Sequence, residues 1–212
     1  AGCTGLFEAA TTTSREPPLV EDRPDAIYVP THVEGMKPIG TADAGGLTVG
    51  AFYSYAHRFW PIENEGGEWV ATRQDVERED AVHLMVTVWE PESGVVVPNT
   101  GVTVELTADG ESVYEEVVYP MLSQRMGNHY GDNTPVAGDA THEVRVDVGG
   151  LDDLARFGTF EGEFGSASSA TFEWEYSEAE RNKIPFRTLD ERQGRRGAVQ
   201  PMEMDALPTG TA

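Results

Sequence analysis

The sequence contains a single cysteine, Cys3, among 212 residues. One cysteine has no partner within the chain for a disulfide bond, and its place near the N-terminus argues against a thiolate zinc site or a catalytic thiolate. The usual enzyme signatures are missing as well: we find no Gly-x-Ser-x-Gly motif, no glycine-rich phosphate loop and no His-Glu-x-x-His motif. We therefore expect a protein that is not an enzyme.

Basic residues are also scarce, with 15 Lys and Arg against 37 Asp and Glu, which gives a formal net charge of -22. A chain so acidic repels nucleic acid and avoids anionic membrane surfaces, so we expect no nucleic-acid partner. Three classes remain: a disordered acidic chain, a binding protein that excludes acidic ligands, and a protein from a very salty compartment. A hydrophobic content of 39% with four Trp and seven Tyr excludes disorder. Because the acidic residues are spread along the chain, the pattern favours a globular halophilic protein.

No apolar run reaches the roughly 18 residues of a membrane span. The sequence nevertheless opens with AGCTG, a small-small-Cys triplet that is typical of the end of a lipoprotein cleavage site. The residues that follow are rich in Thr, Pro and charge and have no periodicity, as in a tether. We therefore expect residues 1–25 to anchor the protein, through a lipid on Cys3, to the outer face of the cell membrane. The alternative is that Cys3 has no role.

From Ala26 onward the sequence alternates between apolar and polar residues with a period of two, which is typical of β-strands. An Asp-Gly pair at 109–110 separates two of these runs and predicts a hairpin turn. Several short strands without a long helix predict an all-β fold, an immunoglobulin-like antiparallel β-sandwich over residues 26–176. Residues 177–212 are expected to form a linker or C-terminal extension that begins with a short helix. The runs that we interpret as strands are 26–35, 47–60, 81–90, 101–110, 111–119, 141–150 and 169–177.

The remaining candidates for chemistry are five histidines, six methionines and many carboxylates. Strand alternation places His32 and Glu34 on one face, about 7 Å apart along the strand, so both can reach one ion. The segment MLSQRMGNHYGDN, residues 121–133, places Met121, Met126 and His129 together in what we expect to be an exposed turn. These residues either fill a gap in a core or share a metal. Imidazole and carboxylate suit a borderline divalent cation, whereas thioether sulfur favours copper or a reduced metal.

Taken together, the motifs HVE and YPMLSQRMGNHYGDN resemble those of the periplasmic Fe2+-transport protein family, the copper-binding, immunoglobulin-like iron-uptake lipoproteins. The resemblance covers roughly residues 26–176. It implies that His32, Glu34, Met121 and His129 are metal ligands, and that the chain forms a homodimer. It also implies delivery of ferrous iron to a membrane iron permease, with copper (Cu2+ or Cu+) as a bound partner.

Two features depart from the family pattern. The spacer between Met121 and His129 is one residue longer, so Met126 is the alternative sulfur ligand. The family's further histidine has no counterpart after Val148, which leaves His57 and His142 as substitutes. We interpret His142 and His83 as structural, and His57 as either a backbone-bonded histidine or a ligand. Met202 and Met204, in MEMD, are weaker candidates for a soft-metal relay.

These observations leave three classes of function open. The first is an extracytoplasmic module that captures ferrous iron or copper for uptake. The second is a mononuclear copper oxidoreductase that uses the same ligands, which would require an open coordination position. The third is a lipid-tethered adhesion or structural sandwich whose histidines are incidental. Because sandwiches serve all three, the fold class does not choose among them.

Overall fold

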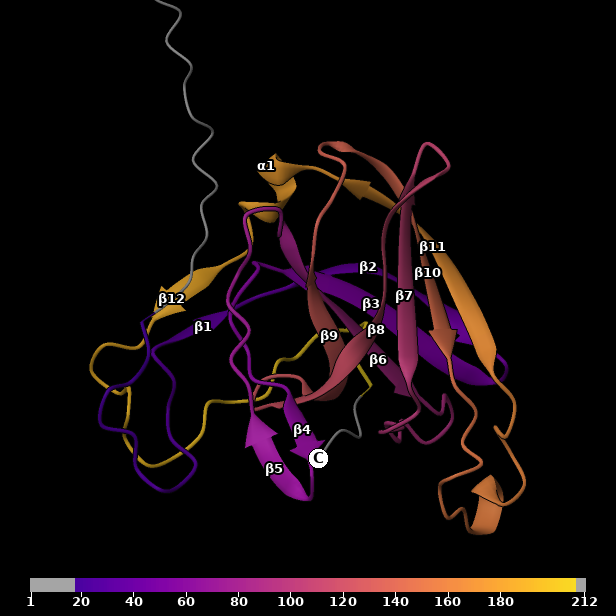
Figure 1. The fold of residues 1–212 in the computed structure, drawn as a ribbon, viewed down its shortest axis with the longest axis horizontal. Helices are drawn as coiled ribbons and strands as arrows, with labels where there is room; N and C mark the ends of the chain where they lie inside the picture. The colour runs from indigo at the N-terminus through magenta and orange to yellow at the C-terminus, as the bar shows by residue number, and fades with distance from the viewer. Residues whose placement is uncertain (1–17, 209–212) are drawn as a thin grey trace, which may run out of the picture.

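Residues 18–208, the part of the chain that the computed structural model describes, form twelve β-strands, one α-helix and one 3-10 turn (Figure 1). Cys3 and most of the expected tether lie outside the described residues. No helix within the described range has the length and apolar character of a membrane span. The elements are β1 (His32–Glu34), β2 (Lys37–Ala44), β3 (Leu47–Ser54), β4 (Ile62–Glu65), β5 (Glu68–Ala71), β6 (Val82–Trp89), β7 (Val102–Ala108), β8 (Glu111–Ser123), β9 (Gly127–Thr134), β10 (Ala140–Val148), η1 (Gly158–Phe160), β11 (Ser168–Tyr176), α1 (Glu178–Arg181) and β12 (Phe186–Thr188).

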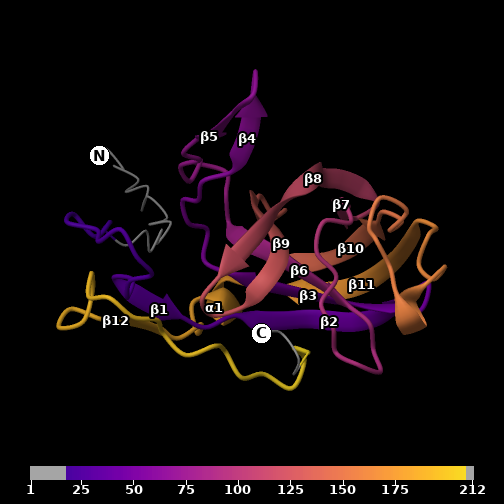
Figure 2. The same ribbon diagram turned by 90° about the horizontal axis from the view of Figure 1, so that it is seen from below.

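Eight antiparallel strands form the body in the order β11-β10-β7-β8-β9-β6-β3-β2. The long strand β8 pairs with β7 along its first part and with β9 along its second part, so it passes from one layer of the sandwich to the other. The two outer strands, β11 and β2, also lie side by side, and Ser168 Oγ donates to the Ala44 carbonyl at 2.9 Å. The predicted all-β antiparallel sandwich is therefore confirmed, with its edges curled together. The β4–β5 hairpin projects from this body (Figure 2).

The alternation read from the sequence places the core correctly. Val82, Leu84, Val86 and Val88 of β6 are fully buried between the layers, together with the apolar residues of β7 and β10. The Asp109-Gly110 turn is confirmed too: both residues have positive φ angles, 52° and 80°, between the paired Ala108 and Glu111. This conformation fits the twist of antiparallel strands and suits Asp-Gly.

The expectation that residues 121–133 form an exposed turn is wrong. Residues 127–134 are strand β9, which pairs with β8 so that Met121 lies opposite His129, and only the residues between Ser123 and Gly127 turn. His129 is 6% exposed. The first strand is also shorter than expected, because β1 covers only His32–Glu34. Strand β9 lacks an apolar alternation because one of its faces is polar, with His129 and Asn133 pointing away from the core of the sandwich.

The segment after Tyr176 packs against the sandwich, so it is an extension of the domain and not a free linker. It begins with the expected short helix, α1, which Ser177 caps by accepting from the Glu180 N–H at 3.2 Å. Ile184 is 2% exposed and joins the main core. Strand β12 then pairs with β1, and the two strands run side by side in Figure 1. The C-terminal segment therefore holds the strand that carries His32 and Glu34.

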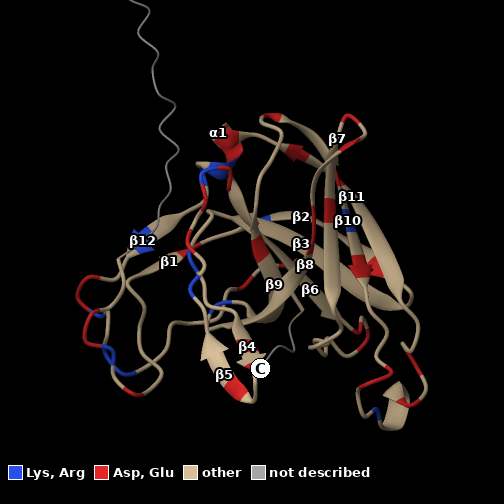
Figure 3. Ribbon diagram, in the orientation of Figure 1, with Lys and Arg blue, Asp and Glu red and all other residues tan. Residues whose placement is uncertain are grey.

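Acidic residues are distributed over the strands of the body and the loops (Figure 3). Because the net charge of -22 repels itself when it is unscreened, we expect the free energy of unfolding to fall as salt is removed. Dilution from molar to millimolar potassium chloride should lower the melting midpoint by roughly 5–10 °C, equivalent to a few kcal/mol. Melts in sucrose at matched osmolality would separate screening from general solute effects. A midpoint that does not respond to salt would count against a halophilic protein.

Candidate metal centre

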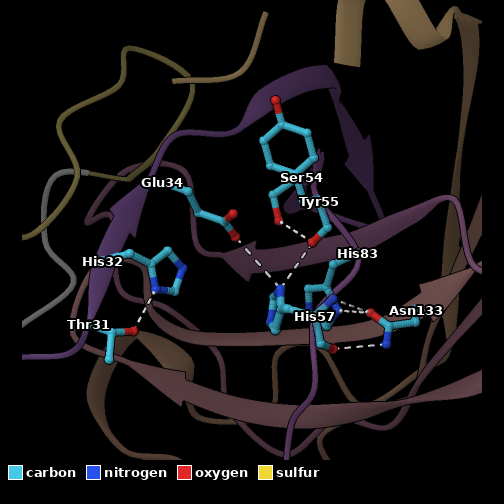
Figure 4. Close-up of polar contacts among 8 residues, drawn as sticks. All are labelled: Thr31, His32, Glu34, Ser54, Tyr55, His57, His83 and Asn133. Atoms are coloured by element: carbon cyan, nitrogen blue, oxygen red, sulfur yellow. Dashed lines mark hydrogen bonds and ion pairs between the residues drawn. The ribbon is translucent and has the colours of Figure 1, made fainter. Parts of the chain in front are cut away.

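Four of the five histidines line one cavity of about 280 Å³ on the outer face of the β3–β6–β9 layer. His83 comes from β6 and His129 from β9, on the faces opposite to the core. His57 follows the end of β3, and His32 belongs to β1, which covers this face together with the C-terminal segment. Glu34 lines the same cavity, so the two residues of the His-x-Glu motif do share a face. Figure 4 shows three of these histidines and Glu34 around the cavity.

His57 and His83 are in direct ring contact, with their centroids 4.1 Å apart. His57 Nδ1 lies 3.1 Å from the Tyr55 carbonyl oxygen and 3.7 Å from Glu34 Oε1. Since a carbonyl oxygen only accepts, Nδ1 of His57 carries the hydrogen and Nε2 keeps a lone pair. The same reasoning applies to His129, whose Nδ1 lies 3.0 Å from the Gly127 carbonyl oxygen. Both rings are thus in the tautomer that can bind a metal through Nε2.

His83 is fully buried, and Asn133 determines its tautomer. The Asn133 amide donates to the His57 carbonyl at 2.9 Å and its Oδ1 accepts from the His57 N–H at 3.2 Å, which fixes the orientation of the amide. The same Oδ1 lies 3.0 Å from His83 Nδ1, so that nitrogen carries the hydrogen. His83 Nε2 is buried without a hydrogen-bond partner among residues 18–208. A buried polar atom left unpaired costs about 1–3 kcal/mol, so this nitrogen is a candidate donor to a bound ion.

The pKa values of all four cavity histidines are lowered, and burial is the largest cause in each case. The pKa of His57 falls to about 4, with the nearby His32 and His129 adding to the effect. The pKa of His83 falls well below its usual range because of burial and then the adjacent His57. The pKa values of His129 and His32 are lowered as well. The cavity thus holds neutral imidazoles, the form that ligates metals.

His142 provides a contrast within the same chain. It is fully buried between β10 and the aromatic rings of Trp174 and Tyr176, away from the cavity. Its Nδ1 lies 3.2 Å from the Ala140 carbonyl oxygen, and its Nε2 accepts from the Ala137 N–H at 3.1 Å. Both nitrogens are satisfied by backbone, which agrees with our structural interpretation of this residue.

Of the two sulfur candidates in β8 and β9, Met126 lines the cavity. Met121 pairs with His129 across the strands but is not part of the cavity wall. Met202, one of the weaker soft-metal candidates, lines the wall as well, whereas sequence reasoning missed Met36 and Met85 and assigned His83 to a structural role. The alternation of β6 was the available signal, because it places His83 and Met85 on the face opposite to Leu84 and Val86 of the core. Tyr130, next to His129 in the sequence, points into the core, where its hydroxyl accepts from the Thr100 N–H at 2.9 Å.

The donors are gathered but not arranged for coordination. Within the described range, no three His, Cys, Asp or Glu side chains lie so that they could hold a metal ion without moving. His32, for example, stacks on Phe186 with ring centroids 4.8 Å apart. Binding would require imidazoles to rotate toward a common point in the cavity. The donor types nevertheless fit copper or ferrous iron.

A second, larger cleft of about 650 Å³ is lined in part by Phe59 and Asn133. Among residues 18–208, carboxylates dominate its wall, and no histidine, lysine or arginine lines it. Burial raises the pKa of Asp132, which accepts from the Tyr114 hydroxyl at 2.8 Å. Among the described residues this cleft offers oxygen ligands and no imidazole, so the histidine cavity is the better candidate centre for a transition metal.

The absence of a side chain at Gly131 leaves space for the imidazole of His83. A Cβ at this position would lie 2.7 Å from His83 Nε2 and 3.1 Å from the Leu84 carbonyl oxygen. Gly131→Ala should therefore displace the imidazole and cost roughly 1–3 kcal/mol of stability. Urea unfolding in wild-type and His83→Ala backgrounds forms a double-mutant cycle that checks this. Equal costs in both backgrounds would show that Gly131 makes no room for the ring.

A family model described as "Domain of unknown function (DUF7350)" matches residues 65–173. Among solved structures, the chain is similar to a copper-bound variant of FetP from uropathogenic Escherichia coli strain F11, with 20% identity, 66% of this chain and 97% of that chain covered, and a TM-score of 0.48. It is also similar to FetP of the same strain "as isolated" from the periplasm of E. coli BL21(DE3), with 18% identity, coverage of 69% and 96%, and a TM-score of 0.45. No curated protein matches the chain. Since the family match covers just over half of the 212 residues, the chain belongs to the family of the domain of unknown function DUF7350.

Proposed function

We propose that the cavity lined by His32, Glu34, His57, His83 and His129 binds one copper or ferrous ion as cargo. The observation that carries this proposal is the buried Nε2 of His83, which has no partner in the described part of the chain. The tautomers of His57 and His129 support it, since each ring leaves the lone pair of its own Nε2 available at the same cavity.

The mixture of donors favours capture of an ion over catalysis. Imidazole with a carboxylate suits Cu2+ and Fe2+, and the thioether of Met126 adds a donor that favours reduced copper. No observation specifically favours the copper oxidoreductase. A purely structural role would leave His83 Nε2 unpaired at a cost that any aliphatic side chain would avoid.

The proposed carrier works outside the cytoplasmic membrane, anchored through Cys3, and passes its ion to a membrane iron permease. This part of the proposal rests on the AGCTG sequence and on the resemblance of the HVE and Pro-Met motifs to the iron-uptake lipoproteins. The homodimer belongs to the same proposal.

The test is a calorimetric titration of the full chain in high salt with Cu2+ and, without oxygen, Fe2+. We expect one ion per chain with a Kd in the micromolar range or below, which corresponds to about -8 kcal/mol or better. An oxygen electrode run on the copper-loaded protein should record no turnover. Binding no tighter than that of the urea-unfolded chain would refute a metal carrier, and sustained oxygen consumption with a reductant would favour the oxidoreductase.

A further inference from the structure

Five of the six methionines gather beside the histidine cavity. Met36, Met85 and Met126 are buried together against Phe52, and Met202 and Met204 pack onto this cluster from the C-terminal segment. Four of the five also line the cavity: Met36, Met85, Met126 and Met202. They come from four separate parts of the chain, so the fold and not local sequence brings them together.

Hydrogen bonds hold the C-terminal segment in place around Met202. The Met202 N–H donates to the Arg125 carbonyl at 2.7 Å, and Arg125 Nη1 donates to the Gln200 carbonyl at 2.8 Å. The Val199 N–H donates to Gln124 Oε1 at 2.8 Å. These bonds join the segment to the β8–β9 turn, which carries Met126. Two of the four thioethers are therefore held in the cavity wall by one hydrogen-bonded unit.

Methionine often fills gaps in a core, so packing is the alternative explanation. The distribution of the buried methionines argues for a role beyond packing. The main core of the sandwich, among the described residues, is built from aliphatic and aromatic side chains and includes no methionine. All three buried methionines lie in the small cluster beside the cavity. Sulfur is thus concentrated where the nitrogen donors are, and not where most packing takes place.

We propose that Met36, Met85, Met126 and Met202 form a separate thioether site for a soft monovalent cation, Cu+, next to the histidine site. Thioethers are soft, uncharged ligands that favour Cu+ over Fe2+ or other hard cations. An uncharged sulfur cage in a buried cluster suits a monovalent ion better than a divalent one, because less charge has to be removed from water. This site goes beyond the proposed function, since Met36, Met85 and Met202 take no part in the histidine site and the thioethers favour a monovalent ion. Binding involves no change of oxidation state.

Silver ion is a soft monovalent cation like Cu+ and is redox-inert, so it serves as the probe. The titration uses potassium nitrate as the salt, because chloride would precipitate silver. In Met85→Leu and Met202→Leu we expect about tenfold weaker Ag+ binding each, with Cu2+ binding changed by less than about threefold. Leucine keeps the volume of the side chain, so packing is preserved. Met121→Leu, outside the cavity wall, is the matched control and should bind Ag+ as wild type does. The reverse pattern, loss of Cu2+ with Ag+ retained, is expected for His83→Ala.

Methionine labelled with 13C at the methyl group provides a readout that needs no variant. Addition of Ag+ to the wild-type chain should shift the methyl signals of Met36, Met85, Met126 and Met202 and leave that of Met121 in place. If both leucine variants bind Ag+ as tightly as the wild type does, the methionine cluster only fills space and the proposed thioether site is refuted. Parallel loss of Ag+ and Cu2+ in variants that melt like wild type would show one shared site in place of two.

Discussion

Replacement of His83 or His129 by alanine is expected to weaken Cu2+ binding by about 100-fold, because each change removes one imidazole from a small set of donors. His83 is fully buried and its Nε2 lacks a partner within residues 18–208, so the change removes a donor that is already dehydrated. Calorimetric titration of each variant measures the effect, and thermal melts verify that the variant is folded.

His142→Ala is the matched control. This histidine is as buried as His83, but backbone groups satisfy both of its nitrogens and it lies outside the cavity wall. Its loss should lower stability and leave the Kd for Cu2+ within about threefold of wild type, as expected for a site that shares no partner with the cavity. If His142→Ala weakens copper binding as much as His83→Ala does, the ion is bound elsewhere or the loss is only structural.

The metal-free protein is expected to lose stability as the pH falls from about 6.5 toward 4. The pKa of His57 is lowered to about 4, and burial holds the pKa of His83 well below its usual value. The unfolded chain therefore takes up protons in this range that the folded chain does not bind. Stability is therefore fully present above pH 6.5, and each buried histidine removes up to about 1.4 kcal/mol per pH unit below it. Since the excess carboxylates become protonated below about pH 5, the range from 6.5 to 5 reports the histidines most clearly.

Urea unfolding at fixed molar salt measures this profile, with the self-repulsion of the carboxylates screened. The double variant His57→Gln, His83→Asn keeps polar side chains of similar size and should flatten the profile between pH 6.5 and 5. A wild-type profile that is already flat in this range would mean that these imidazoles are protonated in the folded state, contrary to their burial.

Local sequence patterns predicted the sandwich because apolar alternation directly reports which face of a strand is buried. Val82 to Val88 alternate in this way, and Asp109-Gly110 is a turn signal that acts within four residues. Strand β9 escaped the same reasoning. Its outward residues, His129 and Asn133, are only 6% and 8% exposed, and Asn133 hydrogen-bonds His57, which follows β3. Polar side chains are therefore buried on this face of β9, as apolar ones would be. The segment resembled an exposed turn for that reason.

The residues of the candidate site also fall into two groups: those that local spacing could bring together and those that only the fold brings together. His32 and Glu34 could be paired from their spacing, because two positions on one strand always share a face. His83 could not be joined to His57 and Asn133 in this way, since their proximity depends on the pairing of β6 with β3 and β9. Met202 required the return of the C-terminal segment to the β8–β9 turn, a contact between residues about 75 positions apart.

The most direct test of the histidine cavity as the metal centre is an anomalous difference map at the copper edge, from crystals of the full chain grown with one equivalent of Cu2+. The account predicts one dominant peak inside the cavity, within bonding distance of Nε2 atoms from His83, His129 or His57. A dominant peak in the carboxylate cleft beside Asp132, with the histidine cavity empty, would contradict it.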